Sequence, residues 1–319
     1  MSVINLVVGF TPYHSLYAES FLGELNGKTY CFFSKRHPDI SSFPQVKMIG
    51  SRKSSLLSIF IYSIYVRFWL LRKFKINLYC PHPCNIAVNY LFFSGRCSSV
   101  TVYEDGVANY YDASRSEWTL PLYKTVLSAL LLMPFRSYAG HITGCDEMFV
   151  DRLFVSRPKS IVKSSRFRRV CHFGLKLKVG KSVGKKGKIL FLDQPVQIPD
   201  DQKEERVKLA FGQLKPGVEV HYKPHHDSVS DFDFMKKLPS SKAKMPAEQL
   251  VAVDDFSVVV SFYSSALLNI STIFKNVRCY YIVADEKMIE VDGKAIRIYD
   301  FLEHYGISPL HGSELFDDS

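Results

Sequence analysis

The chain has 319 residues, which is enough for one large or two medium domains with a sizeable core. Hydrophobic residues make up 47% of the sequence and aromatic residues 14%, which excludes an intrinsically disordered protein. The net charge of +10 favours an anionic partner, but the sequence carries no RNA- or DNA-binding motif, so nucleic acid is not predicted as a partner.

The seven cysteines are odd in number and scattered along the chain. Cys80 and Cys84 form a close pair, but no second pair completes a zinc site. Several cysteines lie in apolar, strand-like runs, which indicates reduced, buried thiols and a cytoplasmic location. The first residues enter an apolar strand without a preceding basic segment, so no secretory signal is predicted.

The first half alternates apolar strands with helices. Strands are expected at residues 4–8, 29–33, 46–49, 76–80 and 100–103, and helices at 13–25, 56–73, 85–94 and 120–132. This alternation predicts a mainly parallel sheet covered by helices. Residues 54–71 are almost long enough to span a bilayer, but Arg67 and several serines interrupt them. A buried or interface-lying helix is therefore favoured over a membrane span.

Two polar segments follow strands of this half. Gly9-Phe10-Thr11-Pro12-Tyr13-His14 comes after the first strand, where the chain turns and offers polar groups to a ligand. The strand at 100–103 runs into Glu104-Asp105-Gly106, followed by Asn109. A carboxylate at a strand end can act as a general base, with the glycine permitting a tight turn. An ordinary β-turn is the alternative interpretation.

A basic stretch separates the two halves. Residues 157–188 contain a dozen Lys and Arg and no acid, and they show no periodicity. They are interpreted as a solvated linker, with attraction to an anionic membrane surface as the second interpretation and a nucleic-acid footprint as the weakest.

The second half repeats the alternation. Strands are expected at 189–192, 218–222, 258–262 and 277–282, and helices at 202–213, 266–274 and 298–305. We therefore predict an α/β protein with two Rossmann-like domains facing a central cleft. The expected parts are an N-terminal, acceptor-side domain (1–156), a basic linker (157–187), a nucleotide-sugar domain (188–297), and a tail (298–319) that can pack back on the first domain. In such sheets, ligands bind beyond the carboxyl ends of the strands.

Three features of the second half satisfy this condition. The strand at 218–222 leads into Lys223-Pro224-His225, whose cationic groups suit an anionic ligand; a His-rich surface turn is the alternative. Adjacent side chains are expected to point in different directions, which disfavours a metal ion shared by His225 and His226. The strand at 258–262 leads into Ser264-Ser265, which can cap a helix with or without binding an anion. Asp193 follows the strand at 189–192.

The ordered set of motifs resembles bacterial sialyltransferases of the GT-B type, the lipooligosaccharide sialyltransferase family (glycosyltransferase family 52) in particular, together with the capsular polysialyltransferases. These share a (D/E)DG motif, an HP motif and a Ser/Thr pair. Glu104-Asp105-Gly106 is similar to the first and Ser264-Ser265 to the third. The HP motif departs from the pattern, because His225 is followed by His226 instead of proline.

The resemblance implies inverting, metal-independent transfer of sialic acid from CMP-sialic acid, with no cofactor, to galactose or sialic acid on lipooligosaccharide or capsule. The implied catalytic residues are Asp105 or Glu104 as the base, Asp193 as the second candidate for the base, and His225 on the donor phosphate. The implied donor-binding residues are Lys223, Pro224, Ser264, Ser265 and Gly106, and the acceptor-binding residues are Thr11, Tyr13, His14 and Asn109.

The implied partners are a CMP-sugar donor and a glycan or glycolipid acceptor. A homodimer and peripheral association with the inner face of the cell membrane are also suggested. Two alternatives stay open at this point. One is a GT-B enzyme with another donor, CMP-Kdo or a UDP-sugar; the other is a non-enzymatic protein that binds polyanions or membrane surfaces.

Overall fold

The computed structural model describes residues 1–49, 55–115, 122–161, 169–177, 188–212, 214, 218–225 and 232–310. The chain divides into two compact units. Unit 1 comprises residues 1–176 with 290–293, and unit 2 comprises residues 177–289 with 294–319. Much of the predicted linker (162–168 and 178–187), His226 and the end of the predicted tail (311–319) lie outside the described residues.

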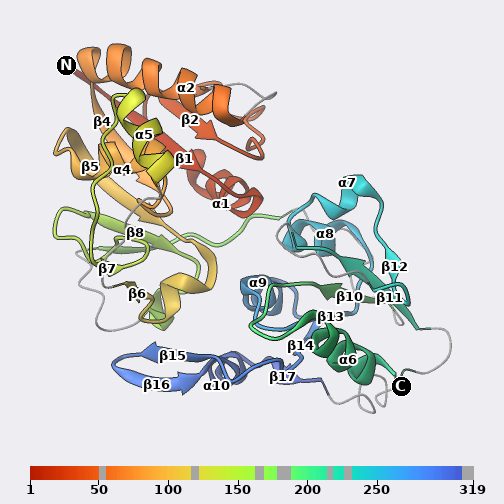
Figure 1. Ribbon diagram of the computed structural model, residues 1–319. Helices are drawn as coiled ribbons and strands as arrows, with labels where there is room; N and C mark the ends of the chain where they lie inside the picture. The colour runs from red at the N-terminus through yellow and green to blue at the C-terminus, as the bar shows by residue number, and fades with distance from the viewer. Residues whose placement is uncertain are drawn as a thin grey trace. The chain divides into compact units, whose positions relative to one another are not determined.

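Unit 1 is built on a parallel sheet in the order β3-β2-β1-β4-β5-β8-β9 (Figure 1). Its strands are β1 (Ser2–Gly9), β2 (Thr29–Phe33), β3 (Val46–Met48), β4 (Phe74–Cys80), β5 (Cys97–Tyr103), β8 (Arg152–Val155) and β9 (Val170–His172). The helical segments are α1 (Pro12–Leu22), α2 (Ser55–Tyr65), η1 (Val66–Leu70), α3 (Leu71–Lys73), α4 (Ile86–Phe93), η2 (Gly106–Tyr110), α5 (Leu122–Leu130) and η3 (Pro158–Ser160). Two short strands, β6 (Ser114–Arg115) and β7 (Gly140–His141), pair separately.

Side chains of β1 alternate between the two faces of this sheet, and both faces are covered. Ile4, Leu6 and Val8 pack with side chains of α2, η1 and α4 in one apolar cluster. Val7 packs with Tyr17 and other residues of α1 in the opposite cluster. Parallel strands that are buried on both faces need continuous apolar runs, which explains why the strands of this half were readable from the sequence.

Unit 2 contains a second parallel sheet in the order β12-β11-β10-β13-β14-β17. Its strands are β10 (Lys188–Leu192), β11 (Glu219–Lys223), β12 (Lys236–Lys237), β13 (Val258–Ser261), β14 (Arg278–Tyr281) and β17 (Ser308–Pro309). Its helices are α6 (Asp200–Phe211), α7 (Ser240–Ala243), α8 (Ala247–Val253), α9 (Ser265–Ile273) and α10 (Ile298–His304). A two-stranded sheet joins β15 (Met288–Val291) and β16 (Lys294–Arg297).

Every strand and helix expected from the sequence is present, with small shifts at the ends. Among the elements not anticipated are β8 and β9, which extend the first sheet, so that part of the predicted linker belongs to unit 1. The segment from 298 to 310 belongs to unit 2. There, Tyr299 of α10 stacks on Tyr281 of β14, with ring centroids 4.8 Å apart.

All seven cysteines are free thiols, and four of them are buried. Burial raises the pKa of the Cys145 thiol to about 12 and that of Cys279 to about 12, which keeps them protonated and unreactive. Across the described ranges, the helices are all too short or too polar to cross a bilayer.

Candidate active site

The carboxyl ends of β1, β4 and β5 are neighbours in the first sheet, and each leads to a titratable side chain. β1 leads to His14 at the start of α1, β4 leads to His82, and β5 leads to Asp105. The strand order reverses between β1 and β4, and ligands of open α/β sheets bind at such a switch point. These three residues therefore define the candidate site of unit 1.

The first turn of α1 fixes the position and the tautomer of His14. Pro12 occupies the first turn, and the Thr11 hydroxyl accepts a hydrogen bond from the His14 N–H (3.1 Å). In return, His14 Nδ1 accepts the main-chain N–H groups of Phe10 (3.1 Å) and Thr11 (3.2 Å). This is a capping box with histidine in the place usually held by glutamate. Because Nδ1 accepts, the ring proton is on Nε2.

His14 Nε2 donates to Asp105 Oδ1 at 2.6 Å, and His82 Nε2 lies 4.0 Å from Asp105 Oδ2. Burial alone would raise the pKa of Asp105. Electrostatic attraction by His82 and His14, with the hydrogen bond from His14, outweighs burial and lowers that pKa below its ordinary value of 3.8. The side chain keeps 26% of its surface exposed, so Asp105 is an ionised carboxylate that a ligand can reach.

Glu104 has the opposite environment, although it is the neighbouring residue. Its side chain is fully buried. Oε1 accepts the Tyr13 hydroxyl (2.6 Å), and Oε2 accepts the Tyr110 hydroxyl (2.6 Å) and both the N–H (2.6 Å) and the hydroxyl (2.7 Å) of Ser156. Four donors on one carboxylate hold the loops after β1, β5 and β8 together. The structure thus gives the two acids of the motif different positions: Asp105 is accessible and Glu104 is enclosed.

The other predicted residues of this unit shape the turn around Asp105. Gly106 has φ of 65°, a left-handed conformation that favours glycine. The Asn109 side-chain oxygen accepts the Asp105 N–H at 2.6 Å, and Asn109 is almost completely buried. Thr11 caps α1, and Tyr13 bonds to Glu104. These contacts place Gly106, Asn109, Thr11 and Tyr13 as supports of the site.

His82 was missed at the level of sequence. It lies between Pro81 and Pro83, directly after β4. The same strand-end criterion that selected Asp105 applies to it and is the signal that identifies it in the sequence. Its ring lies 5.8 Å from that of His14 and 5.2 Å from that of Phe10, measured between centroids.

His14, His82 and Asp105 are close enough to be considered as metal ligands, since their ligand atoms all lie within 4.8 Å of one another. The tautomer of His14 argues against this use. A metal ion would need the Nε2 lone pair, but Nε2 carries the proton as long as Nδ1 accepts two main-chain N–H groups. The arrangement fits a carboxylate held by a hydrogen bond from a histidine better than a metal centre.

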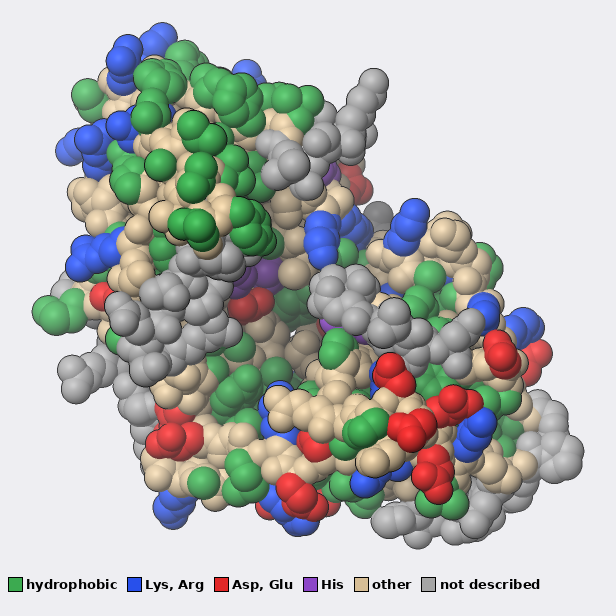
Figure 2. All heavy atoms as spheres, viewed as in Figure 1, with side chains coloured by type: hydrophobic (Ala, Val, Ile, Leu, Met, Phe, Trp, Pro, Cys, Tyr) green, Lys and Arg blue, Asp and Glu red, His purple; other side chains and the backbone are tan. Residues whose placement is uncertain are grey.

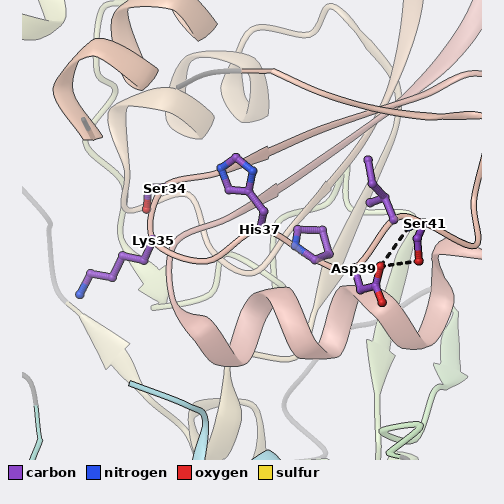
Figure 3. Close-up of a pocket in the computed structure, with 7 residues that line it drawn as sticks. Ser34, Lys35, His37, Asp39 and Ser41 are labelled. Carbon is purple, nitrogen blue, oxygen red and sulfur yellow. Dashed lines mark hydrogen bonds between the residues drawn. The ribbon is translucent and has the colours of Figure 1, made fainter. Parts of the chain in front are cut away.

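A cavity of about 580 Å³ lies along the loop after β2, lined by Ser34, Lys35, His37, Pro38, Asp39, Ile40 and Ser41 (Figure 3). Asp39 accepts hydrogen bonds from the N–H (3.0 Å) and hydroxyl (2.7 Å) of Ser41, which orders one wall. The Ser34 hydroxyl donates to the Phe10 carbonyl (3.2 Å). The cavity loop is therefore fastened to the turn that carries His14.

In unit 2, Asp193 follows β10, but it is enclosed. Lys203 Nζ of α6 lies 2.6 Å from its Oδ1, and the Tyr222 hydroxyl donates to its Oδ2 at 2.9 Å. The Asp193 side chain is fully buried and that of Lys203 is 3% exposed. A buried ion pair of this kind ties α6 to the sheet, and its carboxylate does not reach solvent.

Lys223 and His225 lie at the end of β11. Lys223 Nζ donates to the Ala243 carbonyl at 2.6 Å. Burial lowers the pKa of Lys223, and the carboxylate of Glu248 partly opposes this shift. Pro224 is exposed and His225 is half-buried. Lys223 thus joins β11 to the end of α7, while His225 remains partly accessible.

Ser264 and Ser265 begin α9 directly after β13. The Ser264 hydroxyl accepts the Ala266 N–H at 3.2 Å and caps the helix. The strand order of the second sheet reverses between β10 and β13, so this helix start lies at the switch point of unit 2. The structure brings Ser264 and Ser265 to a position where Rossmann-type sheets bind phosphate groups.

Comparison with solved structures places this architecture. The S. aureus MnaA–UDP co-structure is 12% identical, with a TM-score of 0.52 over 99% of this chain and 86% of that chain. The glycosyltransferase SnogD from Streptomyces nogalater (11% identity, TM-score 0.48, 100% and 92% covered) and a sialyltransferase from Photobacterium damsela (11%, 0.43, 90% and 75%) are also similar. Two Rossmann-type sheets and the likeness to MnaA identify a GT-B fold, as the sequence predicted.

The family follows from the sequence itself. The family model described as alpha-2,8-polysialyltransferase (POLYST) matches residues 44–283, and the chain belongs to this family. It is therefore a glycosyltransferase, and its resemblance to sialyltransferases is confirmed. A comparison with curated protein sequences finds no match.

Proposed function

We propose that this enzyme transfers sialic acid from CMP-sialic acid to a terminal galactose or sialic acid of a bacterial surface glycan, lipooligosaccharide or capsule, with inversion and with no metal or cofactor. Membership of the alpha-2,8-polysialyltransferase family supports sialic acid as the transferred sugar. One structural observation supports general-base catalysis: Asp105 is an accessible carboxylate that His14 holds at the switch point of the first sheet. Because the chain belongs to a transferase family, we do not retain the alternative of a non-enzymatic protein that binds polyanions or membrane surfaces.

In the proposed reaction, the acceptor hydroxyl oxygen forms a bond to the anomeric carbon of sialic acid while the bond from that carbon to the CMP phosphate oxygen breaks. The hydroxyl proton passes to Asp105, and CMP leaves with the bonding electron pair. A carboxylate of lowered pKa is ionised at neutral pH. It can accept this proton because the hydroxyl becomes more acidic as its oxygen bonds to the oxocarbenium-like carbon.

The second unit is assigned to the donor. We propose that His225 stabilises or protonates the departing phosphate and that Ser264, Ser265 and the start of α9 bind it. Lys223 is assigned a supporting role, since its ammonium group is bonded to Ala243. The cavity beside Lys35 and His37 is proposed to receive part of the acceptor. A homodimer and peripheral association with the inner membrane face remain part of the proposal.

A donor screen tests this function. The purified enzyme is incubated with CMP-sialic acid, CMP-Kdo and UDP-sugars, each with galactosides and sialosides, and release of the nucleotide is measured. We expect acceptor-dependent CMP release from CMP-sialic acid alone. Turnover of CMP-Kdo or a UDP-sugar, with CMP-sialic acid left intact, would replace the donor assignment while leaving the fold and family unchanged.

Removal of metal ions is expected to leave the transfer rate within about twofold, because the His14 tautomer makes the three-residue cluster a poor metal ligand set. The rate is measured after dialysis against EDTA, with and without added Mg²⁺, Mn²⁺ or Zn²⁺. Loss of activity that one of these ions restores would contradict the tautomer argument and make the cluster a metal site.

A further inference from the structure

The outer surface of the helix at residues 55–73 is apolar, whereas its inner surface contains polar groups. Ser58 and Ser63 face inward and are buried, and the Ser63 hydroxyl is bonded to the Ile59 carbonyl (2.7 Å). The exposed side chains recur every three or four residues and are 38–51% exposed: Leu57, Phe60, Ile61, Ile64 and Phe68. A helix that faces water on its outer side normally has the opposite distribution.

Helix α5 repeats this reversal. Ser128 is buried and donates to the Met133 carbonyl. Leu122 is 80% exposed and Leu130 is 74% exposed, and Tyr123 and Val126 are also exposed on the same helix. Two helices of unit 1 therefore expose large apolar side chains on their outer side, in addition to those they bury, while the serines named above face inward.

The two helices that carry these exposed side chains lie on the same face of the first sheet. Tyr62 of α2 and Val66 of η1 belong to the apolar cluster against which Leu127 of α5 packs. Figure 2 shows hydrophobic side chains gathered where Figure 1 places α2 and α5, with Lys and Arg near their edge. We call the exposed apolar residues of α2, η1 and α5 the apolar face. Contiguous exposed apolar surface of this kind marks an interaction site.

The charges in the sequence around the α2 and η1 part of the apolar face are all positive. No Asp or Glu occurs between Asp39 and Glu104, whereas this interval holds eight Lys and Arg. Two of the cations lie directly over aromatic rings at the end of the helix. The Arg72 guanidinium is 5.8 Å from the Phe68 ring centroid, and Lys73 Nζ is 5.5 Å from that of Trp69. Long basic side chains beside apolar and aromatic groups suit the boundary between lipid headgroups and acyl chains.

We infer that the apolar face docks on the surface of an anionic lipid bilayer, with the leucine, isoleucine and phenylalanine side chains entering the acyl boundary and the basic residues contacting headgroups. Apolar area and cationic charge act together in this mode of binding. The absence of acids from the sequence of the helix at residues 55–73 favours anionic lipid over a second copy of this basic chain. The membrane contact is thereby assigned to the apolar face of unit 1. This assignment holds whichever donor and acceptor the enzyme uses.

Vesicle flotation tests the inference. Purified full-length protein is mixed with vesicles of phosphatidylcholine alone or with 30% phosphatidylglycerol, and the bound fraction is measured at low and high salt. The test variant is Phe60→Ser/Ile64→Ser/Leu130→Ser. The matched control is Leu209→Ser, which alters a 75% exposed leucine on α6 in unit 2. Thermal unfolding checks that both variants are folded.

We expect wild-type protein and the Leu209→Ser control to bind the anionic vesicles, the triple variant to bind at least tenfold less, and high salt to weaken binding. Transfer to a soluble acceptor should be unchanged in the triple variant. Equal binding by wild type and triple variant, or equal loss in the control, would overturn the assignment. Absence of vesicle binding, with a concentration-dependent dimer that the triple variant abolishes, would assign the apolar face to a second copy of the chain instead.

Discussion

Replacing Asp105 with Asn is expected to lower kcat for sialyl transfer by about 10²–10⁴-fold, with little change in the KM for the donor. Asn keeps the size of the side chain and can still contact His14, but it does not accept a proton. The measurement is steady-state CMP release with a saturating acceptor. The control is Glu24→Gln, a surface carboxylate of the same unit in a loose 3.3 Å pair with Lys176, which should retain wild-type kcat.

The pH dependence of stability checks that a loss of activity in Asp105→Asn does not come from unfolding. The pKa of Asp105 is lower in the folded protein than its ordinary value of 3.8. The carboxylate therefore stabilises the fold above pH 3.8, and this contribution is lost as the pH falls through the lowered pKa. The free energy of unfolding of Asp105→Asn should lie slightly below that of wild type at pH 7 and approach it in acid.

An Asp105→Asn protein that is folded and has the kcat of wild type would rule out Asp105 as the base.

Breaking the Asp193–Lys203 pair is expected to destabilise the protein by about 3–5 kcal/mol in either single variant, Asp193→Asn or Lys203→Met, because each leaves a buried charge without its partner. The double variant should recover most of this loss, since no unpaired charge remains. Stability is measured by urea unfolding of all four proteins.

The same variants decide between the two candidates for the base. If the role of Asp193 is structural, the folded double variant should keep kcat within about threefold of wild type. A stable double variant whose kcat falls by about 10²-fold or more would restore Asp193 as the catalytic carboxylate. The Asp105→Asn result is independent of this experiment, because the two residues belong to different compact units.

Much of the fold was predictable because parallel strands buried on both faces require uninterrupted apolar runs. The runs at β1, β10 and β13 made these strands visible, and the polar residues that follow them marked the ligand-binding edge of each sheet. Short elements such as β8 and β9 were not predicted, since a few residues carry too little periodicity to separate strand from loop.

The roles of adjacent acids could not be predicted from their order. Glu104 is enclosed because Tyr13, Tyr110 and Ser156 converge on it from three separate segments. Asp193 likewise meets Lys203 and Tyr222 only after α6 and β11 pack against β10. The sequence shows neither convergence, because the partners of each acid lie on different elements that meet only on folding.

The sequence by itself determined the α/β class, nearly all of the main strands and helices, the family, and the strand-end motifs that contain Asp105, His225 and Ser264. Only the tertiary structure decided which strands are neighbours, and hence that His82 and His14 flank Asp105. It also decided that the helix at residues 55–73 exposes a second set of apolar side chains on its outer side. Local residue preferences fix the elements, whereas solvent access and electrostatic environment arise from side chains that come together only on folding.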